Sequence, residues 1–137
     1  MVNPTIQTND ARELSIFNAI FGDANIKRGA AGTLLKGTVL AFDETVNTYL
    51  PTQSPGTVGT DDNAKAIIPC DMEFAGTETL AGRIIEGGEI DENLLVFFDG
   101  DDTPDTALPS GDTIRTELRN YGITLRNVVD DSVLDNA

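Results

Sequence analysis

The sequence predicts a mainly β protein of the α+β class. We expect a compact, small β-barrel or sandwich-like body with one C-terminal helix followed by a strand, plus a flexible N-terminal arm. Three observations support this prediction. Short runs rich in β-branched and aromatic residues are separated by Gly, Pro, Asn and Asp. A helical period occurs near the end of the chain. The first residues are polar and include an early proline.

Residues 1–28 are predicted to form the arm and residues 29–137 the body. The stretch VNPTIQTND is polar and typical of extended chain. In the following ARELSIFNAIFGD, helical spacing predicts a short amphipathic helix that ends at Gly22. The apolar residues of this stretch are Leu14, Ile16, Phe17, Ile20 and Phe21. An extended segment whose apolar side chains await a partner surface fits equally well, and periodicity alone does not separate the two.

The body begins after a small, locally basic hinge, IKRGAAG, at residues 26–32. Residues 33–50 are predicted to form a hairpin, and TQSPGTVGTDDN is predicted to be a loop. Four more short strands are expected, and the glycine pair Gly87-Gly88 indicates a turn or bulge. These strands are AKAIIP (64–69), MEFA (72–75), LAGRII (80–85) and LLVFF (94–98).

The end of the chain changes period. DTIRTELRNYG predicts a helix capped by Asp112 and ended by Gly122 at the C′ position. Its buried face is predicted from Ile114, Leu118 and Tyr121, with Arg115, Glu117 and Arg119 facing away. ITLRNVV then predicts a final strand. The residues that we assign to the core are Cys70, Phe97, Phe98, Leu118 and Ile123.

Composition limits the partners and the compartment. The formal net charge is −14 at pH 7, from 23 acidic and 9 basic residues, so a phosphate backbone would be repelled and nucleic acid is not expected. The first residues lack the basic and apolar stretches of a secretory signal. No apolar run approaches the roughly 20 residues that span a bilayer. We expect a soluble protein that is made in a cytoplasm and contacts no membrane.

Little in the sequence indicates catalysis. The chain has no histidine and a single cysteine, which removes the usual general base and excludes a four-ligand zinc site. We therefore expect neither an enzyme nor a cofactor. The acidic stretch FFDGDDTPDTALPSGDT, residues 97–113, fails the EF-hand pattern because Pro104 stands where that loop needs glycine. A solvated loop is the preferred interpretation, and an irregular calcium site is the minority hypothesis, at Asp99, Asp101, Asp102 and Asp105.

Five stretches, taken in order, carry a resemblance to a known family. They are IKRGAAGTLLKGTVL (26–40), YLP (49–51), AKAIIPCDMEF (64–74), GRIIEGGEIDENLLVF (82–97) and TIRTELRNYGITLR (113–126). Together they resemble the head decoration, or capsid cement, proteins of tailed phages, the family of the phage lambda decoration protein. The arm and the long acidic loop depart from the family pattern.

The resemblance implies a structural virion protein with no catalytic site. Such proteins sit as homotrimers on the outer surface of the expanded head and clamp the major capsid protein against the pressure of packaged DNA, after synthesis in the host cytoplasm. The arm would bind the capsid, so shell binding should be lost, and the body kept folded, when residues 1–28 are removed. The implied capsid-binding residues are Thr5, Ile6, Leu14, Ile16, Phe17, Ile20 and Phe21.

The sequence is compatible with two other functions. A β-rich virion trimer of another kind, associated with a tail or fibre, would share the composition and the lack of catalytic residues. An acidic, calcium-dependent binding module would instead use the aspartates of residues 99–105.

Overall fold

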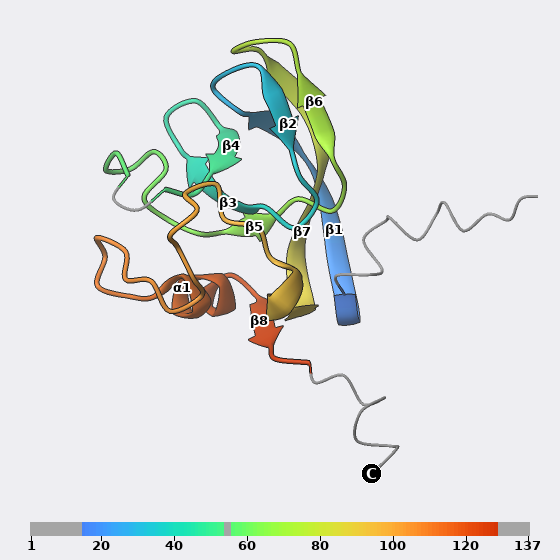
Figure 1. The fold of residues 1–137 in the computed structure, drawn as a ribbon, viewed down its shortest axis with the longest axis vertical. Helices are drawn as coiled ribbons and strands as arrows, with labels where there is room; N and C mark the ends of the chain where they lie inside the picture. The colour runs from blue at the N-terminus through green and yellow to red at the C-terminus, as the bar shows by residue number, and fades with distance from the viewer. Residues whose placement is uncertain (1–14, 54–55, 129–137) are drawn as a thin grey trace, which may run out of the picture.

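The computed structural model describes residues 15–53 and 56–128. Eight strands, a short 3-10 helix at Glu92–Leu94 and one α-helix make up this part of the chain (Figure 1). The elements are β1 (Ser15–Lys27), β2 (Gly32–Leu34), β3 (Val39–Asp43), β4 (Thr48–Pro51), β5 (Ala66–Ile67), β6 (Met72–Phe74), β7 (Thr79–Asp91), α1 (Ile114–Asn120) and β8 (Ile123–Arg126).

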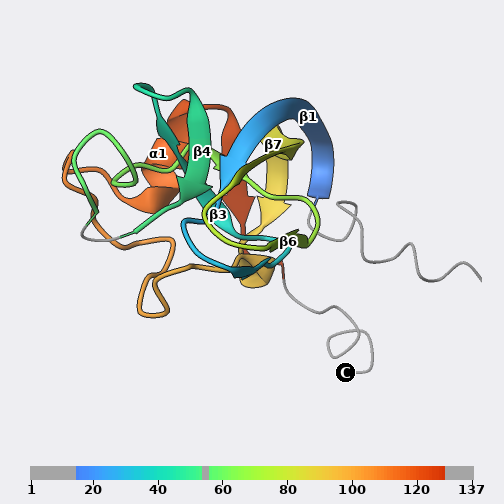
Figure 2. The ribbon, with the colours of Figure 1, turned by 90° about the horizontal axis from the view of Figure 1, so that it is seen from above.

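Strand pairing closes a small barrel. The strands follow the order β1-β4-β3-β5-β7, and a further β1–β7 pairing returns to the start (Figure 2). β1 and β7 pair antiparallel over most of their length, whereas β1 joins β4 in parallel at one register position, Ile26 opposite Tyr49. β8 adds in parallel to the end of β7, outside this ring. The barrel confirms the predicted mainly β class with a late helix and a following strand.

Two apolar clusters form the core, on opposite faces of β3, β5 and β7. Neighbouring residues alternate between the clusters, as the two-residue period of a strand requires. The cluster inside the barrel holds Ile26, Leu34, Leu40, Ala66, Ile68, Phe74 and Ile84, so β2 and β6 each contribute one side chain to it. The cluster under α1 holds Val39, Ala64, Ile67, Ile85, Ile90, Leu108, Ile114, Leu118, Ile123 and Leu125.

The helix forms near its predicted place with a different cap. Thr113, not Asp112, is the N-cap, because its hydroxyl accepts a hydrogen bond from the Thr116 amide at 3.2 Å. Gly122 has a φ of 102°, which confirms its role after the helix. Leu118 and Ile123 are fully buried, as predicted. Tyr121 is instead 50% exposed, because it lies at the C-cap, beyond the last helical turn.

The predicted strand at residues 94–98 is wrong. The glycine pair does not end β7, which continues to Asp91, and the Asp91 carboxylate then accepts from the Asn93 amide at 3.0 Å to start the 3-10 helix. After it, Val96 makes only an isolated bridge to Thr38. Phe97 is partly buried against the cluster under α1. Phe98 is 40% exposed, so the assignment of Phe98 to the core is also wrong.

Cys70 is exposed and not in the core. Ile67 and Ile68 occupy the buried positions of this segment, and the chain turns after the buried Pro69. The next residue, Asp71, accepts a hydrogen bond from the Lys36 amide at 2.7 Å. Cys70 therefore lies on the outside of a turn.

The predicted boundary at residue 28 does not separate an arm from a body. Residues 15–27 are strand β1, so the extended alternative holds there and the helical one is wrong. Because β1 closes the barrel, removal of residues 1–28 would remove part of the fold, contrary to the expectation that the body stays folded without them. The rest of the predicted arm, with Thr5, Ile6 and Leu14, lies outside the described residues.

Candidate interaction surfaces

The β1–β7 ribbon continues past the barrel. Residues 21–27 pair in unbroken register with residues 79–85. Residues 15–20 pair irregularly with residues 87–90, with two register shifts among them and a third between Ile20 and Phe21. We call residues 15–21 with residues 85–90 the ribbon extension. Apart from the parallel contact at Ile26, β1 has no strand other than β7 beside it among the described residues, so the outer edge of the ribbon extension is unpaired.

A close approach of the two backbones shapes the ribbon extension. Asn18 has a φ of 54°, and Gly88, opposite it, has a φ of 109°. A Cβ atom at Gly88 would lie 2.6 Å from the carbonyl oxygen of Asn18. The Ile20 side chain covers Gly87, where an added Cβ would meet its Cδ1 at 3.0 Å. The glycine pair therefore marks a bulge, one of the two alternatives that the sequence offered, and glycine is required by both space and conformation.

The ribbon extension carries exposed apolar side chains. Ile20 is 58% exposed and Phe21 is 39% exposed. The guanidinium carbon of Arg83 lies 5.4 Å from the centroid of the Phe21 ring, within cation-π range. Of the predicted capsid-binding residues, Ile16, Phe17, Ile20 and Phe21 all belong to β1. The ribbon extension thus joins an unpaired strand edge to an exposed apolar surface.

The acidic loop does not gather its carboxylates around one point. Arg115 bonds Asp105 at 3.1 Å and forms a two-pronged pair with Glu92 at 2.8 and 3.1 Å. These hydrogen bonds, first that to Glu92 and then that to Asp105, raise the pKa of Arg115. Asp105 is therefore held away from a shared cation site by an ion pair.

Asp102 differs from its neighbours in the acidic loop. Burial, then the charges of Asp99 and Asp101, raise the pKa of the Asp102 carboxyl. Its Oδ2 is buried without a hydrogen-bond partner. Within residues 15–53 and 56–128, no three acidic or cysteine side chains are arranged to hold a metal ion. The calcium hypothesis stays a prediction that this geometry does not support.

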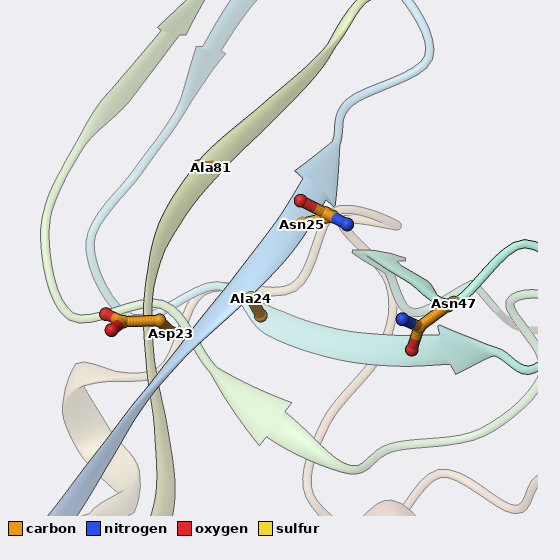
Figure 3. Close-up of a pocket in the computed structure, with 5 residues that line it drawn as sticks. All are labelled: Asp23, Ala24, Asn25, Asn47 and Ala81. Atoms are coloured by element: carbon orange, nitrogen blue, oxygen red, sulfur yellow. The ribbon is translucent and has the colours of Figure 1, made fainter.

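A polar pocket of about 290 Å³ lies between β1 and the β3–β4 turn. Its lining residues are Asp23, Ala24, Asn25, Asn47 and Ala81. Figure 3 shows that the Asp23 side chain points away from Asn47, so the polar groups do not converge on one ligand position.

A second pocket, of about 420 Å³, is lined by aromatic and charged residues. The Lys65 ammonium lies 4.7 Å from the Tyr121 ring centroid, 5.8 Å from that of Phe42 and 3.9 Å from Glu44. Burial, with the Glu86 charge, raises the pKa of Tyr49 on the same wall. The Lys65 ammonium therefore already covers two of the aromatic rings that line this pocket.

Sequence reasoning missed two polar residues that organise this side of the molecule. Glu117 was predicted to face solvent, but it is buried, accepting from the Ala64 amide at 3.0 Å and from the Ser110 hydroxyl at 2.7 Å. Lys65 stands in a strand-like run, and its side chain is 18% exposed. The only sequence signal for the position of Lys65 is that it stands between two alanines predicted to be in a strand. No nearby residue indicates that Glu117 is buried.

No helix in the described part of the chain is long and apolar enough to cross a membrane. Comparisons with protein-family models, with curated proteins and with solved structures each find no match to this chain.

Proposed function

We propose that this chain is a structural virion protein without an enzymatic role. It binds the outer surface of the expanded head of a tailed phage as a homotrimer, contacts the major capsid protein and stabilises the head against the pressure of packaged DNA. The observation that carries the proposal is the ribbon extension, whose unpaired edge and exposed Ile20 and Phe21 provide a docking surface.

The order of elements supports the family resemblance. The stretch TIRTELRNYGITLR forms a helix, a left-handed glycine at Gly122 and a strand, as the resemblance implies for the end of the body. The stretch GRIIEGGEIDENLLVF agrees less well: residues 82–91 lie in β7, but the strand predicted at its end, residues 94–98, does not form. These agreements concern fold, and they favour the function only through the resemblance.

The ribbon extension suits attachment to a shell made of β-structure. An exposed strand edge can add to the sheet of a partner through backbone hydrogen bonds, while neighbouring side chains give specificity. Because a head repeats the same site many times and a trimer presents several extensions together, individually modest contacts become collectively strong. The net charge of −14 keeps the free protein soluble and disfavours contact with DNA.

The test is co-sedimentation with expanded, empty heads of the source phage. We expect the intact chain to pellet with the heads in whole trimers, and the Ile20→Ser/Phe21→Ser variant to stay in the supernatant. Val58→Ser is the matched control, because Val58 is an apolar residue that is 82% exposed in the loop before β5, away from the ribbon. Deletion of residues 1–28 is not a clean test, since it removes β1.

Two results would contradict the proposal. If the intact chain does not pellet with heads, the resemblance reflects fold alone, and pelleting with purified tails would then favour the alternative of a tail or fibre trimer. Equal binding of the wild type and of the Ile20→Ser/Phe21→Ser variant would remove the ribbon extension as the docking surface.

A further inference from the structure

An apolar groove lies at the turn that follows β2, apart from the ribbon extension. It has a volume of about 320 Å³. Two of its lining residues are large and exposed: Leu35 is 50% exposed and Phe98 is 40% exposed. Val96 and Phe97 also line the groove. Exposing two large apolar side chains around a concave surface is unfavourable in water, so an apolar occupant would be stabilised there.

Arg28 stands on the rim of this groove in a fixed position. Its Nη1 donates to the carbonyl oxygens of Ala30 at 3.1 Å and Ala31 at 2.7 Å. Its guanidinium carbon lies 5.4 Å from the Phe98 ring centroid. The guanidinium also packs on Gly32, where a Cβ would lie 2.6 Å from Cζ. The side chain is therefore ordered before any partner arrives, which lowers the entropic cost of using it.

The Arg28 guanidinium still has unused hydrogen-bonding capacity. Its Nε is buried without a partner. Among the described residues, no carboxylate forms a salt bridge with Arg28, although the chain has 23 acidic residues. A buried donor without an acceptor costs free energy, and a carboxylate is the acceptor whose geometry a guanidinium matches best. The groove therefore fits an apolar side chain flanked by carboxylates.

We propose that the groove binds residues 130–135 of this same chain, DDSVLD. In this stretch, Val133 and Leu134 are flanked by Asp131 and Asp135. The apolar pair would cover Leu35 and Phe98, and a flanking carboxylate would accept from Arg28. The charges are complementary, because Arg28 follows Lys27 in the locally basic stretch IKRGAAG.

The described chain ends close enough for this segment to reach the groove. The Asn93 amide group donates to the Asn127 side chain at 2.9 Å and to the Val128 carbonyl at 3.3 Å, so the chain leaves the body beside the 3-10 helix (Figure 2). Val96, on the groove wall, follows Asn93 by three residues, at most about 10 Å of chain. Leu134 follows Val128 by six positions, a step that spans up to about 20 Å.

The experiment is NMR of the full chain, with the Leu35 methyl and Phe98 ring signals as the reporters. We expect Val133→Ser/Leu134→Ser to shift both signals and to leave the Ile20 methyl signals in place. A synthetic peptide of residues 130–135, added to that variant, should return the two signals toward their wild-type positions. Arg28→Lys in the same variant should weaken binding of the peptide about tenfold, because lysine keeps the charge but lacks the forked donors of the guanidinium. Arg119→Lys, on the exposed face of α1, is the matched control and should not change peptide binding.

Two outcomes would overturn the inference, and neither depends on capsid binding. If the Leu35 and Phe98 signals have the same positions in the wild type and in Val133→Ser/Leu134→Ser, the segment does not occupy the groove. Wild-type signals that move toward those of the variant on a roughly hundredfold dilution would identify a second copy as the source of the occupant, since only an intermolecular contact follows mass action.

Discussion

The same two strands, β1 and β7, build two different structures along one ribbon. Inside the barrel, residues 21–27 and 79–85 pair without interruption, and Ile26 is completely buried. In the ribbon extension, the pairing shifts register three times between Ser15 and Phe21, Asn18 takes a positive φ, and Ile20 is 58% exposed. One strand therefore supplies both a core element and an exposed edge.

The difference shows which neighbours impose order on a strand. Inside the barrel, β1 is fixed by β7, by the parallel contact with β4 and by the apolar cluster that contains Ile26. A slip of one residue would turn Ile26 to the outside, so the register is strongly specified there. In the ribbon extension only β7 lies beside β1 among the described residues, and bulges are tolerated. For β1, we expect stability to depend on its residues inside the barrel and interaction to depend on its residues in the ribbon extension.

The largest expected effect separates these two parts with one substitution in each. Ile26→Ala should lower the free energy of unfolding by about 3 kcal/mol, because it leaves a cavity inside the barrel. Ile20→Ala, the matched change in the ribbon extension, should cost about 0.5 kcal/mol or less. Urea unfolding at pH 7 measures both. Similar losses for the two variants would show that the ribbon extension is as much a part of the folded core as the barrel.

A smaller effect is expected from the glycine that shapes the ribbon extension. Gly88→Ala should lower the free energy of unfolding by about 2 kcal/mol, because a β-carbon meets the Asn18 carbonyl and the positive φ becomes strained. Thermal and urea unfolding measure the change. A glycine-to-alanine change in a regular part of a strand would not combine a collision with the opposite backbone and a strained φ.

Two other glycines separate strain from collision. Gly29 has a φ of 92° but open space around it, so Gly29→Ala should cost only about 1 kcal/mol, from strain alone. Gly100 has open space and no positive φ, so Gly100→Ala should cause no loss. If Gly88→Ala costs no more than Gly29→Ala, the close approach of β1 and β7 contributes nothing to the stability of the bulge.

Much of the barrel could be predicted because its signals are local. All but one of the β-rich runs, the helical period after Asp112 and the left-handed Gly122 led to the right element, because these signals depend on nearby residues. The prediction of a strand at residues 94–98 was wrong because an apolar run does not show whether a neighbouring strand has an unpaired edge to bind it. β7 runs on through the glycine pair, and the Asp91 cap then turns the chain.

The candidate surfaces were less predictable, because they depend on distant neighbours. The apolar residues of β1 were identified from sequence, but periodicity did not reveal that residues 15–27 close the barrel. Glu117 was placed on the wrong face because its partner, the Ala64 amide, lies 53 residues away in the sequence. The groove beside Arg28 was missed altogether, since it combines a basic turn with Leu35 and Phe98 from separate parts of the chain.

The smallest expected effect concerns the junction between the two parts of the ribbon. Phe21 is the first residue of the regular pairing, and Arg83 lies over its ring. A double-mutant cycle of Phe21→Ala and Arg83→Gln, followed by urea unfolding, should give a coupling of about 0.5 kcal/mol, as expected for an exposed cation-π contact. The coupling should persist in high salt, because contact of a cation with an aromatic ring is screened less than an ion pair between exposed groups. A coupling of zero would mean that Arg83 does not hold Phe21, and that the regular register begins at residue 21 because of backbone pairing and the buried barrel residues alone.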